Sequence, residues 1–100
     1  SAKIAKVGSV LQKYPNTIVQ VVGHTDSRGS YSYNKTLSEK RASNVGNTIF
    51  NSGVQNQIFS KGCSFDKPVA PNSNATNMAL NRRVEIFLYP NEQSVIDVCK

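Results

Sequence analysis

The 100-residue sequence contains no tryptophan, one methionine, one histidine and only two cysteines. Two cysteines and a distant histidine make a poor set of metal ligands, so we expect neither a metal ion nor another cofactor. No apolar run reaches about 18 residues, so we expect no membrane insertion by this chain itself. It also has no Gly-x-Ser-x-Gly motif for a nucleophilic serine. These absences argue against a metal centre, a membrane span and a serine hydrolase.

Acidic residues are also scarce, with six Asp and Glu against twelve Lys and Arg, giving a net charge of +6. Such a surface suits acidic partners, and nucleic acid is one class of these. However, no basic run is longer than the pairs Lys40-Arg41 and Arg82-Arg83, and the eight aromatic residues form no stacking series. We therefore expect no nucleic-acid binding. The length fits one domain with a modest core.

The most informative segment is Gly23-His24-Thr25-Asp26-Ser27-Arg28-Gly29, which follows a β-branched run at 18–22. The continuous apolarity of that run predicts a central strand covered on both faces. Asp26 then lies in a short loop just beyond the strand, and Gly29 is suited to a turn with positive φ. A lone histidine beside an aspartate does not indicate catalysis here, and we expect His24 to hydrogen-bond the backbone.

The stretch from residue 34 to about residue 52 has no proline and is predicted to be a helix. At about 100° per residue, Leu37, Ala42 and Ile49 share one apolar side, and Arg41 falls within it. A guanidinium in that position must reach solvent or find an acceptor. Asp26 is the nearest acid on the loop that leads into the helix. Two interpretations stay open: a structural Asp26–Arg41 salt bridge, or one site for a ligand that carries an amine and a carboxylate.

The remaining chain predicts a helix over 4–14, a short strand at 58–60, a loop over 61–74, a short helix after Asn74 or Thr76, and a strand at 83–89. Cys63 and Cys99 form an even pair, which fits a disulfide in an oxidising compartment. A bridge would close a loop of about 36 residues and contribute roughly 3–4 kcal/mol in the chain-entropy model. Two free thiols are the alternative.

Several motifs occur together: Gly23-His24-Thr25-Asp26, then Gly29, Asn34, Leu37-Ser38, Arg41-Ala42 and Val45, and later Asn81-Arg82-Arg83-Val84-Glu85-Ile86. This pattern resembles the C-terminal peptidoglycan-binding domain of the outer membrane protein A family. Peptidoglycan-associated lipoproteins and flagellar stator proteins share that domain. The resemblance covers roughly residues 4–88.

The resemblance implies that Asp26 takes the ammonium of diaminopimelate in a peptidoglycan stem peptide and that Arg41 takes its carboxylate. It also assigns Asn34, Arg82 and Thr25 to the peptidoglycan-binding residues. The chemistry is sensible without the family, because one carboxylate and one fork-shaped guanidinium match an amine and a carboxylate on the same carbon.

The implied fold is α+β, a βαβαβ(α)β-type domain whose mixed sheet packs against helices on one face. This chain starts in helix, so the first strand is expected to be absent, which would expose a sheet edge and invite pairing with a second copy. Residues 1–100 would form one domain of a longer envelope protein in the periplasm of a Gram-negative bacterium. That domain would anchor the protein, which is associated with the outer membrane, to the cell wall. Whether a β-barrel, a lipoprotein or a stator carries the domain stays open.

Two other functions are carried as alternatives. A peptidoglycan-acting enzyme could use Asp26 as acid or base, but glycan hydrolysis normally needs a second carboxylate at a suitable spacing. A pure protein-interaction domain would keep Asp26 and Arg41 as a structural pair. We expect no catalytic residue.

Overall fold

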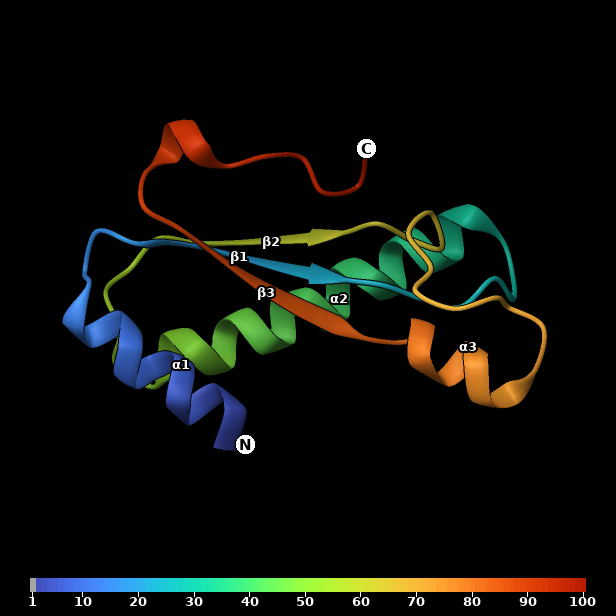
Figure 1. Ribbon diagram of the computed structural model, residues 1–100, viewed down its shortest axis with the longest axis horizontal. Coiled ribbons are helices and arrows are strands. Elements are labelled where there is room, and N and C mark those ends of the chain that lie inside the picture. Colours follow the sequence, from blue (N-terminus) through green and yellow to red (C-terminus); the bar gives the residue numbers. More distant parts are fainter. Residues whose placement is uncertain (1) are drawn as a thin grey trace.

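The computed structural model describes residues 2–100, which fold into three α-helices and a three-stranded mixed sheet (Figure 1). The elements in chain order are α1 (Ala2–Lys13), β1 (Ile18–Gly23), α2 (Tyr31–Asn51), β2 (Ile58–Gly62), α3 (Ala75–Asn81), β3 (Val84–Tyr89) and a 3-10 turn η1 (Glu92–Ser94). The predicted α+β class and the order of elements are confirmed. As expected, the described chain begins with a helix and not with a strand.

Local capping sets the ends of two helices. The expected central helix begins three residues earlier than predicted, because Ser30 caps it and its hydroxyl accepts from the backbone N–H of Tyr33 at 3.1 Å. In the same way the side chain of Asn74 accepts from the N–H of Asn77 at 2.9 Å and starts α3. Asn74, one of the two predicted caps, is therefore the residue used.

The sheet has the strand order β2-β1-β3. Strand β1 runs parallel to β2 and antiparallel to β3, and each of its six residues is buried. The prediction of a central, doubly covered strand is thus confirmed. Within residues 2–100, the outer edges of β2 and β3 carry no further strand.

The core lies between the sheet and helices α1 and α2, which lie along the same face (Figure 1). Val19 and Val21 of β1 point to this side and pack with Leu11, Ala42 and Ile49, all fully buried. The apolar stripe predicted for the central helix is therefore its sheet-facing side.

Two facing glycines let the start of α2 approach the sheet closely. Gly23 of β1 and Gly62 of β2 are partners in the ladder, and a Cβ on either would overlap atoms of Ser38. This approach brings the first half of α2 over the loop that carries Asp26, so the glycine pair positions the site.

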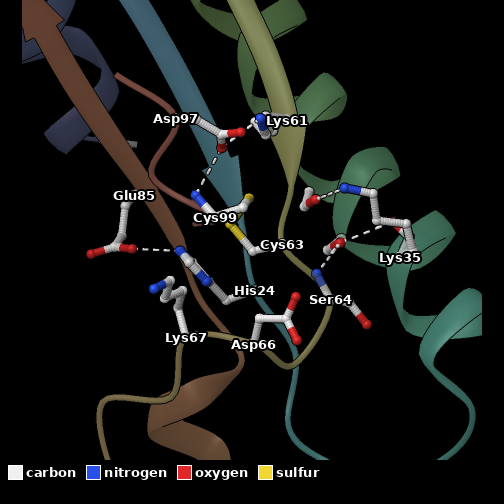
Figure 2. Close-up of a disulfide and its surroundings, with 12 residues drawn as sticks. His24, Lys35, Lys61, Cys63, Ser64, Asp66, Lys67, Glu85, Asp97 and Cys99 are labelled. Carbon is white, nitrogen blue, oxygen red and sulfur yellow. Dashed lines mark hydrogen bonds and ion pairs between the residues drawn. A yellow bond between two sulfur atoms is a disulfide. The ribbon is translucent and has the colours of Figure 1, made fainter. Parts of the chain in front are cut away.

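The C-terminal residues run back alongside β2, on the side of the sheet away from α1 and α2 (Figure 1). Lys61 of β2 points to that face and pairs with Asp97 at 2.6 Å. The predicted disulfide between Cys63 and Cys99 is present and attaches the tail just beyond β2 (Figure 2). Within residues 2–100, no helix combines the length and the apolarity needed to cross a bilayer.

Candidate ligand-binding site

A pocket of about 390 Å³ opens where the loop after β1, the first half of α2 and the junction between α3 and β3 meet. All five residues assigned to peptidoglycan binding from the sequence line it: Thr25, Asp26, Asn34, Arg41 and Arg82. Arg28, Gly29, Tyr33 and Leu37 complete the lining. The structure therefore brings together residues that lie up to 57 positions apart in the sequence.

The carboxylate of Asp26 is the buried acid of the pocket, with the residue 4% exposed. The Arg28 guanidinium donates to it through Nη2 at 2.8 Å and Nε at 3.2 Å, and Arg82 Nη1 donates at 2.8 Å. The side-chain hydrogen bonds from Arg28 hold the pKa of Asp26 well below its usual range, with help from the backbone N–H of Arg28 and from Arg82. Burial opposes this shift but does not cancel it. The carboxylate therefore stays ionised at any physiological pH.

Arg41 lies on the same pocket wall as Leu37, one helical turn away, and it is half-buried. In the described chain, Asp26 pairs with Arg28 and Arg82, and no ion pair joins it to Arg41. Of the two interpretations left open by the sequence, the structural Asp26–Arg41 salt bridge is therefore wrong. The physical reason is proximity, because Arg28 lies two residues from Asp26 in the same turn and Arg82 lies at the end of α3. Their guanidinium groups occupy the carboxylate oxygens of Asp26.

Thr25 and Asn34 use their polar groups to shape the loop. The Thr25 hydroxyl donates to the carbonyl of Asp26 at 2.9 Å, and Thr25 is only 3% exposed. Asn34 Nδ2 donates to the carbonyls of Arg28 at 2.7 Å and Ser30 at 3.0 Å. These bonds clamp the turn at Gly29, whose φ of 87° matches the positive value expected from the sequence. Both residues position the acid and the helix start.

The Asn-Arg-Arg motif supports the site from the other side. Asn81 is fully buried and accepts from the backbone N–H groups of Val69 and Ala70, while its own amide donates to Asn72. Asn72 in turn accepts from the N–H of Ser27 at 3.3 Å. These amide hydrogen bonds connect α3 and the loop before it to the turn that carries Asp26.

Sequence reasoning missed Arg28 and the amide hydrogen bonds. The sequence carried a signal for the turn alone, because aspartate often accepts the backbone N–H two residues further on, as Asp26 Oδ1 does from Arg28 at 3.0 Å. It carried no signal for the contact of the Arg28 guanidinium with Asp26. The backbone N–H groups of Ser27 and Arg28 are both bonded within the protein, to Asn72 and Asp26 respectively.

His24 lies on the other side of the sheet, next to the disulfide (Figure 2). Its Nε2 contacts Glu85 at 2.5 Å. We had expected the side chain to hydrogen-bond the backbone, and this expectation is wrong. Burial lowers the pKa of His24, Arg83 lowers it further, and Glu85 opposes them. Within residues 2–100, no three His, Cys, Asp or Glu side chains are grouped so as to hold a metal ion.

Comparison with known proteins identifies the family of the chain. The chain matches the OmpA family model over residues 1–82 and belongs to the OmpA family. It is 44% identical over 85 residues to the probable lipoprotein YiaD of Escherichia coli (strain K12), covering 84% of this chain and 39% of YiaD. The chain thus spans about two fifths of that relative.

Two solved structures are similar in fold. The peptidoglycan-associated lipoprotein from Burkholderia pseudomallei superimposes with a TM-score of 0.84 at 29% identity, over 88% of this chain and 75% of that one. The cell wall anchor of the T6SS from Pseudomonas aeruginosa gives a TM-score of 0.71 at 33% identity, over 85% of this chain and 62% of that one.

Proposed function

We propose that this domain binds peptidoglycan non-covalently through the diaminopimelate of the stem peptide, and that it does so without catalysis. The observation that carries the proposal is the pocket itself, with a buried ionised acid on one wall and an unpaired half-buried guanidinium on another. Asp26 would receive the ammonium, and Arg41 would receive the carboxylate on the same carbon. Thr25, Asn34 and Arg82 would hold the acid and its loop in place.

The pocket contains both charges that a zwitterionic carbon requires. Arg41 has no ion-pair partner among the described residues, so its donors are available to a carboxylate. Leu37 and Tyr33 add apolar and aromatic surface on the same wall. A fork-shaped guanidinium can hold a carboxylate by two bonds, which fixes the orientation of the bound carbon.

The same geometry argues against a peptidoglycan-acting enzyme. Two guanidinium groups keep Asp26 ionised, so it has no proton to give as a general acid. Asp26 is also the one carboxylate among the residues that line the pocket, whereas glycan hydrolysis normally uses two. Binding without turnover is the function that the pocket supports best.

Relatives named as a peptidoglycan-associated lipoprotein and as a cell wall anchor support a role in anchoring. We infer that the chain is one domain of a longer envelope protein, located in the periplasm of a Gram-negative bacterium and associated with the outer membrane. The disulfide agrees with an oxidising compartment. Pairing of two copies through the open edge of β2 or β3 stays a prediction, which a concentration series in analytical ultracentrifugation tests.

A pull-down with purified sacculi tests the proposal. The parent domain should sediment with diaminopimelate-containing sacculi and release no soluble fragments. Arg41→Ala should lose sedimentation, whereas Lys40→Gln, which removes a neighbouring exposed charge outside the pocket, should retain it. Release of muropeptides by the parent would favour the enzyme. Equal sedimentation of Arg41→Ala and the parent would reject the site.

A further inference from the structure

Arg28 already occupies the position on Asp26 that a ligand's ammonium would need. Three of its groups contact the carboxylate: the backbone N–H at 3.0 Å, Nε at 3.2 Å and Nη2 at 2.8 Å. Together with Arg82 these donors reach both carboxylate oxygens of Asp26. An ammonium therefore cannot reach the acid with full hydrogen bonding unless one of these donors leaves.

We propose that Arg28 is a displaceable internal counter-ion, which neutralises Asp26 before a ligand binds and moves into solvent when an ammonium takes its place. This inference rests on the proposed function, because it names the group that competes with the ligand's ammonium for Asp26. The Arg28 guanidinium would thereby weaken ligand binding, and it would make no contact with Asp26 in the bound state.

Exposure decides which arginine moves. The side chain of Arg28 is 66% exposed, and within residues 2–100 its guanidinium bonds Asp26 alone. The side chain of Arg82 is 35% exposed and extends from the C-cap of α3, which the buried Asn81 fixes against the neighbouring loop. Arg28 can rotate into water with little loss of packing, whereas Arg82 is held in place. The backbone N–H of Arg28 can also stay on the carboxylate while the guanidinium leaves.

The arrangement predicts a requirement for two charges on the ligand. An ammonium alone only exchanges one cation for another at Asp26, so the net gain is small. A ligand that also places a carboxylate on Arg41 gains a new ion pair in addition to that exchange. Arg28 lowers the affinity for both kinds of ligand, and the added ion pair with Arg41 makes the zwitterionic carbon the preferred ligand class.

The test compares Arg28→Gln with the parent by calorimetric titration of free diaminopimelate. Removing an exposed competing ion pair should tighten binding by about two- to fivefold. Lys40→Gln removes the same unit charge from an exposed position outside the pocket and should leave the affinity within error or slightly weaker. The diamine 1,5-diaminopentane, which has no carboxylate, should bind the parent more weakly than diaminopimelate does and should gain a similar two- to fivefold from Arg28→Gln.

The outcomes separate this inference from the proposed function. If the parent binds diaminopimelate but Arg28→Gln binds it equally or more weakly, Arg28 is a ligand contact or a bystander and the inference is wrong. If neither the parent nor Arg28→Gln binds diaminopimelate, while both are folded by circular dichroism, the proposed function itself fails. If Lys40→Gln tightened binding as much as Arg28→Gln does, the gain in affinity would come from the change in net charge alone. That result would also overturn the inference.

Discussion

Removal of the Cys63–Cys99 disulfide should destabilise the domain strongly, because this bond attaches its C-terminal tail covalently to the residue after β2. The bridged residues are 36 positions apart, and the chain-entropy model gives about 4 kcal/mol for a loop of this length. For a domain of this size that corresponds to a fall in melting temperature of roughly 15–20 °C. The test is thermal and urea unfolding of a Cys63→Ala, Cys99→Ser double variant beside the parent.

The order in which parts of the variant lose protection is also predicted. Besides the disulfide, an ion pair between Lys61 and Asp97 holds the tail (Figure 2). Both side chains of this pair are about one third exposed. Pairs of this kind contribute little. Hydrogen exchange should therefore show residues 91–100 opening in the variant while β1 stays protected. A melting temperature within 2 °C of the parent, or a tail as protected as before, would refute this account of the bridge.

Three further perturbations test the packing and the electrostatics. Gly23→Ala should destabilise the fold by about 2–3 kcal/mol or more, because its Cβ meets the backbone carbonyl of Ser38, and urea unfolding measures this. His24, the one histidine of the sequence, should titrate in NMR with a pKa below 6.5, so stability should fall as the pH drops below 6.5; a pKa above 6.5 would show that Glu85 outweighs burial and Arg83. Asp26→Ala should cost about 1–3 kcal/mol because it leaves Arg82 without its acceptor, whereas Arg41→Ala should cost under about 1 kcal/mol; equal losses would indicate that Arg41 is structural.

The sequence was sufficient to predict the central strand, the order of elements and the stripe that places Arg41 on a buried side of α2. These features follow from periodicity and turn chemistry, which are local. The family motifs also identified five residues that line one pocket. Their roles in binding stay predictions, because geometry alone does not show a ligand.

The partner of Asp26 could not be predicted from the pattern. Arg28 is close to Asp26 in the sequence, and Arg41 and Arg82 belong to the motifs of the same family pattern, so all three were candidate partners. Which of them contacts the acid depends on the backbone of the turn and on how closely α2 approaches the sheet. Helical periodicity gives the face on which Arg41 lies but not its distance from the loop. The path of the tail could not be predicted either, because the sequence suggested the disulfide but not the side of the sheet on which the tail would lie.

The central claim is that one carboxylate on the ligand meets Arg41 while its neighbouring ammonium meets Asp26. Calorimetric titration with two synthetic stem peptides tests it directly, one with diaminopimelate and one with lysine, which lacks only that carboxylate. Loss of one charge-assisted contact predicts binding of the lysine peptide about ten- to a hundredfold weaker in the parent, and no difference between the peptides in Arg41→Ala. Equal affinity of the parent for the two peptides would contradict the account.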